Sequence, residues 1–178
     1  MAVGKPVTAP MSVAQGTPQP GNYGVSHGNG IVGELIRHAT ESWAGHAFIY
    51  VGQGMIVEAG NPATRISPAS CHPDAIWNLG EPLTNTQRDK IVQRARALVG
   101  CPYDYPAYVG FALEVLGLRT GKQLEDVFKH DKWRVCSADV ADAYGFAGID
   151  LTAGLQYPNL ISPADLYNRI AKQAGGQP

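Results

Sequence analysis

Apolar and polar positions along the chain follow two periodicities, one helical and one extended. Over residues 31–40 apolar side chains recur every three or four positions, which predicts a short amphipathic helix. Residues 47–51 and 55–59 are two apolar runs joined by a glycine-containing turn, a pattern typical of a β-hairpin. A further short strand is predicted over residues 75–79. The first half of the chain therefore predicts a helix followed by a small sheet.

Capping residues mark the helices of the second half. Thr84 and Gln87 have the spacing of a capping box, which predicts a helix that starts there and ends at Gly100. The pattern Ser162-Pro163 followed by an acidic residue predicts the start of another helix near the C-terminal end. This part of the sequence therefore predicts helices that begin and end at recognisable residues.

Three further segments lie between these two helix starts. Residues 105–116 and 136–146 are predicted to be helical, and residues 123–129 to form a polar turn. The order of helix, hairpin and then helices predicts an α+β fold, with a small antiparallel sheet packed against helices.

The domain organisation follows from composition. Residues 1–24 are rich in Pro, Gly, Thr and Gln without periodicity and are expected to form an extended arm. Residues 25–172 are expected to form a single catalytic domain, and residues 173–178 a tail.

Composition and charge exclude several classes of function. The 178 residues carry a net charge of -1, so the broad basic surface of a nucleic-acid-binding protein is not expected. No apolar run approaches the roughly 20 residues that span a bilayer. The first residues lack the apolar stretch of a secretory signal, so synthesis in the cytoplasm is expected.

Cysteine usage gives no sign of a disulfide framework. Cys71, Cys101 and Cys136 form an odd set without a C-x-x-C pair, which argues against structural zinc as well. A Cys71–Cys101 bridge stays open, although a small buried hydrophobic role is the simpler expectation for both. No metal or other cofactor is expected.

Cys136 and His46 stand out because of the elements that they begin. Cys136 opens an apolar helix and His46 opens an apolar strand. A thiol becomes nucleophilic as a thiolate, which a neighbouring imidazolium or a helix N-terminus favours. Either residue alone would more often be an ordinary buried side chain, but together they predict a cysteine-nucleophile enzyme.

Glu58 is the expected third member of this site, provided that the hairpin turn has the right length. A two-residue loop pairs Glu58 with Ile49, away from His46, whereas a three-residue loop pairs it with Phe48, diagonal to His46. The glycines in the turn favour the three-residue loop. Glu58 can then accept a ring N–H of His46 and orient the imidazole.

Three segments of this chain resemble a known family. Residues 46–59 (HAFIYVGQGMIVEA), 98–103 (LVGCPY) and 135–151 (VCSADVADAYGFAGIDL) resemble, in that order, the circularly permuted branch of the NlpC-like, papain-fold cysteine peptidases, the YiiX-like group. The resemblance extends from about residue 21 to 165 and implies a permuted papain-like fold.

The resemblance also implies roles for individual residues. Cys136 matches the nucleophile, His46 the general base and Glu58 the orienting residue, while Tyr103 and Ser137 are expected to line the substrate or oxyanion site. Two positions depart from unpermuted relatives, since Val135 and Ala138 stand where these carry Asp and Gly. These departures bear on substrate specificity more than on the chemistry.

The activity implied by the resemblance is hydrolysis of an amide bond through a thioester, most naturally a peptide bond of bacterial peptidoglycan. Permuted relatives also include lecithin–retinol-type acyltransferases, so a lipid ester or amide is an alternative substrate. A different class of function is a structural component that keeps the fold within a larger assembly, such as a phage tail that carries a wall hydrolase.

Overall fold

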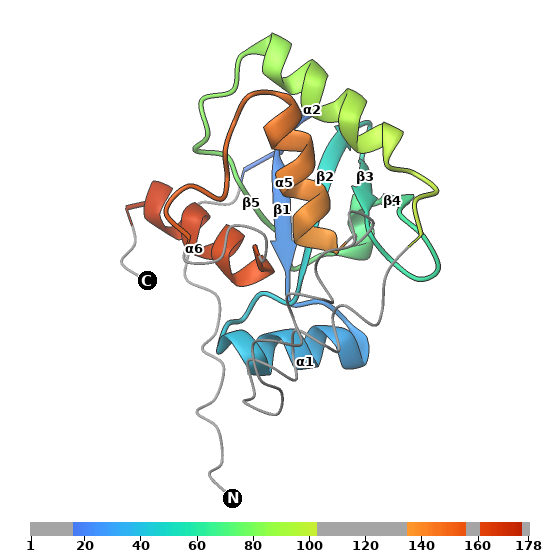
Figure 1. Cartoon of the computed structure of the whole chain (residues 1–178), viewed down its shortest axis with the longest axis vertical. Coiled ribbons are helices and arrows are strands. Elements are labelled where there is room, and N and C mark those ends of the chain that lie inside the picture. The colour runs from blue at the N-terminus through green and yellow to red at the C-terminus, as the bar shows by residue number, and fades with distance from the viewer. Residues whose placement is uncertain (1–15, 103–134, 156–160, 176–178) are drawn as a thin grey trace, which may run out of the picture.

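The structure is a computed structural model that describes residues 16–102, 135–155 and 161–175. Its centre is a five-stranded antiparallel sheet with the strand order β4-β3-β2-β1-β5 (Figure 1). The strands are β1 (Tyr23–Ser26), β2 (His46–Gly52), β3 (Met55–Glu58), β4 (Arg65–Pro68) and β5 (Ile76–Trp77). The helices described are α1 (Gly30–Thr40), α2 (Asn85–Ala97), α5 (Cys136–Phe146) and α6 (Pro163–Gln173), with a 3-10 turn η1 at Ala69–Cys71. The predicted α+β class is confirmed.

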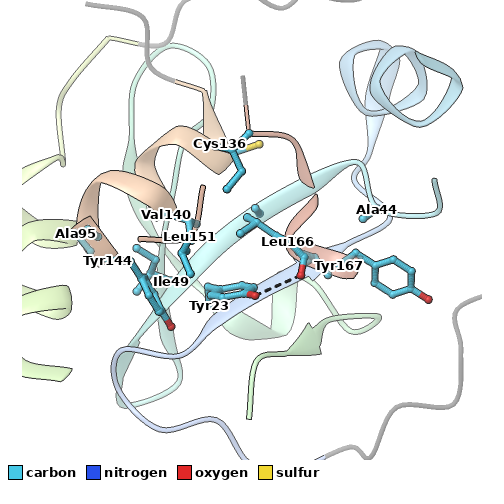
Figure 2. Close-up of a cluster of buried hydrophobic side chains, with 14 of the residues drawn as sticks. Tyr23, Ala44, Ile49, Ala95, Cys136, Val140, Tyr144, Leu151, Leu166 and Tyr167 are labelled. Carbon is cyan, nitrogen blue, oxygen red and sulfur yellow. Dashed lines mark hydrogen bonds between the residues drawn. The ribbon is translucent and has the colours of Figure 1, made fainter. Parts of the chain in front are cut away.

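The core lies between one face of the sheet and the helices. Helix α5 packs across β2 and α2 packs against both, while α6 contacts β1 (Figure 1). Cys136, Val140 and Tyr144 are spaced four residues apart and bury one face of α5 against the sheet (Figure 2). The hydroxyl of Tyr23 donates to the carbonyl of Leu166 at 3.3 Å and so connects β1 to α6. These contacts fix the start of α5 relative to the strands.

The hairpin has the register that the three-residue loop predicts. Phe48 lies opposite Glu58, and Tyr50 opposite Ile56, with an irregularity at Gly52. All three turn residues, 52–54, have positive φ angles of 95°, 55° and 71°. The glycines adopt this left-handed region without steric cost, which explains why the turn forms here.

The predicted starts of α2 and α6 are also confirmed, whereas α2 ends at Ala97, before the predicted Gly100. The Thr84 side chain accepts the N–H of Gln87, and the Gln87 side chain accepts the N–H of Thr84, which completes the capping box of α2. Ser162 and Asp165 form the same arrangement at the start of α6. The predicted helix 105–116 and turn 123–129 lie outside the described residues.

One prediction about the sheet needs correction. The expected arm 1–24 includes Tyr23 and Gly24, which instead belong to β1, and Tyr23 is fully buried in the core. Strand β4 is an addition to the strands predicted from the sequence; Arg65–Pro68 is only four residues long and ends in a proline, so its pattern is weak. No helix in the described part of the chain has the length and apolar character needed to cross a bilayer.

Candidate active site

The fold brings the two residues singled out in the sequence, Cys136 and His46, into contact. Each is the first residue of its element, α5 and β2, and their side chains hydrogen-bond to each other. Nε2 of His46 lies 3.0 Å from Oε2 of Glu58, which leaves Nδ1 as the ring nitrogen that faces the sulfur. The three side chains therefore form one series, from sulfur to imidazole to carboxylate.

The surroundings of His46 favour its protonated form. Burial by itself would lower the pKa of His46, but hydrogen bonds with Cys136 and Glu58 outweigh it and raise the pKa to about 9. The imidazole is then a cation at neutral pH, held against the thiol. An adjacent cation and a helix N-terminus both favour the thiolate form of a cysteine.

Cys136 is nearly buried, with 2% of its surface exposed, and two hydrogen bonds fix the first turn of its helix. The hydroxyl of Thr64 donates to Oδ2 of Asp139 at 2.9 Å, and the hydroxyl of Ser137 donates to the carbonyl of Ile161 at 2.7 Å. Both bonds are buried. They connect the start of α5 to the β3–β4 connection and to the segment before α6.

Glu58 accepts hydrogen bonds from four side chains although it is only 4% exposed. Oε2 lies 3.0 Å from Nε2 of His46 and 2.9 Å from Nε2 of His72. Oε1 accepts from Nε and Nη2 of Arg65, both at 3.1 Å, and from the hydroxyl of Ser67 at 2.6 Å. Each oxygen of the carboxylate therefore has at least two hydrogen-bond partners.

These donors keep Glu58 ionised. Burial would raise the pKa of Glu58, but hydrogen bonds from His46, His72 and Ser67 hold it well below its usual range. Glu58 is thus a fixed negative charge that can orient His46 and stabilise its imidazolium form.

Three residues of this site were not predicted from the sequence: Arg65, Ser67 and His72. Arg65 lies directly opposite Glu58 in the β3–β4 pair, and Ser67 is two positions further along the same face. The alternation of polar and apolar residues in β4 is the signal that could have found both. His72 follows the 3-10 turn, where no periodicity predicts its direction.

A cavity of about 180 Å³ opens beside Cys136 and His46. Its lining includes Cys136, His46, Glu58 and Arg65 together with residues of α1. Helix α1 approaches closely because Gly45 has no side chain: a Cβ there would lie 2.9 Å from the backbone oxygen of Gly33 in α1. Cys136 and His46 therefore line a small cavity beside α1.

The remaining predicted site residues lie elsewhere or outside the described chain. Ser137 is buried and its hydroxyl is bonded to the Ile161 carbonyl, so its predicted substrate-lining role stays a prediction. Tyr103 lies outside the described residues. Cys71 is exposed rather than buried, Cys101 is half-buried, and both are free thiols.

One set of side chains among those described has ligand atoms that could hold a metal ion. The ligand atoms of His46, Glu58 and His72 lie within 4.8 Å of one another. However, Oε2 of Glu58 is already at hydrogen-bond distance from both rings, and the Arg65 guanidinium lies 3.1 Å from Oε1. An ion would have to replace both imidazole hydrogen bonds beside a permanent positive charge. The arrangement fits a hydrogen-bonded carboxylate better than a metal centre.

Comparison with known proteins supports the fold through structure. No family model matches the sequence, and no curated protein matches it significantly. The crystal structure of metalloprotein YiiX from Escherichia coli O157:H7 is similar, with a TM-score of 0.55 and 18% sequence identity. The match covers 89% of this chain and 83% of that chain. At this identity the likeness shows a common fold.

Proposed function

We propose that this protein is a cysteine hydrolase that cleaves amide bonds, with Cys136 as nucleophile, His46 as acid and base, and Glu58 as the orienting carboxylate. The observation that carries the proposal is the hydrogen-bonded series from Cys136 through His46 to Glu58. A thiol, an imidazole and an ionised carboxylate in this order are the parts of a nucleophilic triad.

The arrangement supports a two-step acyl transfer. The Cys136 thiolate attacks the amide carbonyl carbon and a C–S bond forms, while negative charge develops on the carbonyl oxygen. The positive end of the α5 dipole lies at this point of the chain and favours that charge. The proton on His46 passes to the leaving nitrogen, the C–N bond breaks, and an amine leaves a thioester on Cys136.

Water completes the cycle. Neutral His46 takes a proton from water, the resulting hydroxide attacks the thioester carbon, and the C–S bond breaks. A carboxylic acid leaves, and the thiolate–imidazolium pair is restored. Glu58 stays ionised throughout and holds the ring by accepting the Nε2 hydrogen.

For the substrate we propose a peptide bond of bacterial peptidoglycan. The support is the resemblance of the His46 and Cys136 segments to permuted NlpC-like peptidases, together with the YiiX-like fold. The order of the chain, with the histidine strand before the cysteine helix, agrees with the permuted arrangement. YiiX is described as a metalloprotein. In this chain the candidate metal ligands His46, Glu58 and His72 hydrogen-bond to one another, and the proposed mechanism has no step through a metal.

Incubation of the purified protein with isolated peptidoglycan tests this function. Mass spectrometry of the soluble products should reveal fragments with one new amino and one new carboxyl group. Cys101→Ser is the matched control, because it removes a half-buried thiol outside the triad. We expect wild type and Cys101→Ser to release fragments and Cys136→Ser to release none.

Two other results would assign another function. Release of fatty acid from a lipid ester or amide, without wall fragments, would favour the lipid-directed alternative. No turnover of either substrate, with an unreactive Cys136, would favour a structural component of an assembly such as a phage tail.

A further inference from the structure

The proposed hydrolase uses one imidazole, yet a second one binds the same carboxylate oxygen. Nε2 of His72 lies 2.9 Å from Oε2 of Glu58, a distance within 0.1 Å of that from Nε2 of His46 at 3.0 Å. The His46 and His72 rings lie 5.3 Å apart, centroid to centroid. Acyl transfer itself assigns no proton step to His72, so its contact with Glu58 calls for a separate explanation.

The partner on the other side of the ring indicates which nitrogen carries the hydrogen. Nδ1 of His72 lies 3.2 Å from the hydroxyl oxygen of Ser26, which is fully buried in β1. A hydroxyl can donate to Nδ1 or accept from it, whereas an ionised carboxylate only accepts. Glu58 therefore requires a hydrogen on Nε2 of His72, and Ser26 accommodates that state of the ring.

The Glu58 carboxylate needs a hydrogen-bond donor at Oε2 to have a fixed orientation. Arg65 and Ser67 hold Oε1, but the last torsion of a glutamate side chain is soft, so one held oxygen leaves the other free to swing. A second donor on Oε2 fixes the plane of the carboxylate, and with it the direction from which His46 is held.

We propose that His72 is a positioning residue of this site, which holds the Glu58 carboxylate so that it orients His46 toward Cys136. This inference rests on the proposed hydrolase function and adds a fourth residue to its machinery. The fixed position of His72 supports it, because its backbone N–H donates to Ala69 at 3.0 Å and its carbonyl accepts from Ala75 at 3.1 Å.

A packing role is the competing explanation. The His72 ring stacks on Phe48, with centroids 4.5 Å apart and planes 25° from parallel, so it also covers this face of the sheet. The two roles make opposite demands on the side chain. Packing needs an aromatic ring, whereas positioning needs an N–H about as far from Cα as Nε2.

Two substitutions separate these roles. His72→Phe keeps the ring and removes the donor, whereas His72→Gln keeps an N–H donor of similar reach and removes the ring. We would measure kcat and KM on peptidoglycan fragments, the alkylation rate of Cys136 by iodoacetamide, and Tm. We expect His72→Phe to lower kcat and the alkylation rate at least about tenfold with KM unchanged, the lower end of the effect of one lost hydrogen bond to a charged group. His72→Gln should stay within about threefold of wild type.

The opposite ranking, with His72→Phe near wild type and His72→Gln impaired, would overturn the proposal in favour of packing. Nitrogen-15 NMR of the wild-type histidine rings tests the contact without any substitution that could affect folding. A hydrogen on Nε2 of His72 is expected, and a neutral ring with its hydrogen on Nδ1 alone would overturn the proposal. A wild-type Cys136 with no enhanced reactivity would overturn the hydrolase function itself, whereas an active enzyme indifferent to His72→Phe would overturn only the role of His72.

Discussion

Glu58→Gln is the substitution that best probes the series of hydrogen bonds. Glutamine preserves the volume of the side chain and one acceptor oxygen but removes the charge. Its amide must direct the oxygen at the two histidines or at Arg65 and Ser67, because it cannot accept on both sides. The Arg65 side chain is 55% exposed and can turn to water, so we expect the oxygen to face His46 and His72.

The size of the effect follows from this geometry. A hydrogen bond to a charged group contributes about 1.5–3 kcal/mol, and a neutral one about 0.5–1.5 kcal/mol. Loss of the charge therefore removes about 1–1.5 kcal/mol from the orientation of His46, which corresponds to about a tenfold decrease in kcat/KM. Glu58→Ala leaves no acceptor and should cost at least about a hundredfold. Because the Arg65 side chain is largely exposed, loss of its ion pair with Glu58 should lower the free energy of unfolding of these variants only slightly.

Peptidoglycan turnover and the alkylation rate of Cys136 are the two assays for these variants. Circular dichroism and Tm would establish that each variant is folded, and Glu34→Gln is the matched control, because it makes the same substitution at an exposed glutamate of α1. Glu58→Gln and Glu58→Ala with wild-type rates in both assays would refute the orienting role of Glu58.

Three further predictions concern pH and the scaffold. The pKa of His46 is raised to about 9, so the imidazolium is present below that pH and kcat/KM should fall as pH rises through about 9. In Glu58→Gln one cause of the raised pKa is lost, so the fall in kcat/KM should begin at lower pH, and an unchanged pH profile would contradict this. Thr64→Val removes the buried hydrogen bond to Asp139 and should lower the free energy of unfolding, measured by denaturant titration, by about 2 kcal/mol. Thr64→Ser keeps the hydroxyl and should keep most of the wild-type stability, and equal stability of the two variants would contradict a stabilising role of this hydrogen bond. Gly45→Ala places a Cβ 2.4 Å from the His27 backbone oxygen and 2.9 Å from that of Gly33 in α1, so it should reduce both Tm and activity. Gly145→Ala, which meets nothing within 4 Å, should leave both near wild type, and a Gly45→Ala protein with wild-type Tm would count against the close packing of α1.

The sequence predicts the hairpin and its register because the determinants are local. Two glycines fix the turn, and the alternation of side chains then places Glu58 diagonal to His46. The capping residues of α2 and α6 are equally local, since each contact spans three positions.

The rest of the site depends on contacts that no local pattern encodes. His72 reaches Glu58 from the end of a 3-10 turn, and its direction is set by the path of the chain after β4. Strand β1 is only four residues long and gains its stability from pairing with β2 and from the burial of Tyr23, so its composition alone suggested an arm.

The central claim is that His46 activates the Cys136 thiol, and competition between the cysteines tests it most directly. Accessibility alone ranks exposed Cys71 first, half-buried Cys101 second and buried Cys136 last. Limiting iodoacetamide at slightly acidic pH, followed by peptide mass spectrometry, should instead label Cys136 first, and His46→Ala should abolish that preference. Labelling in the order of exposure, unchanged by His46→Ala, would contradict the account.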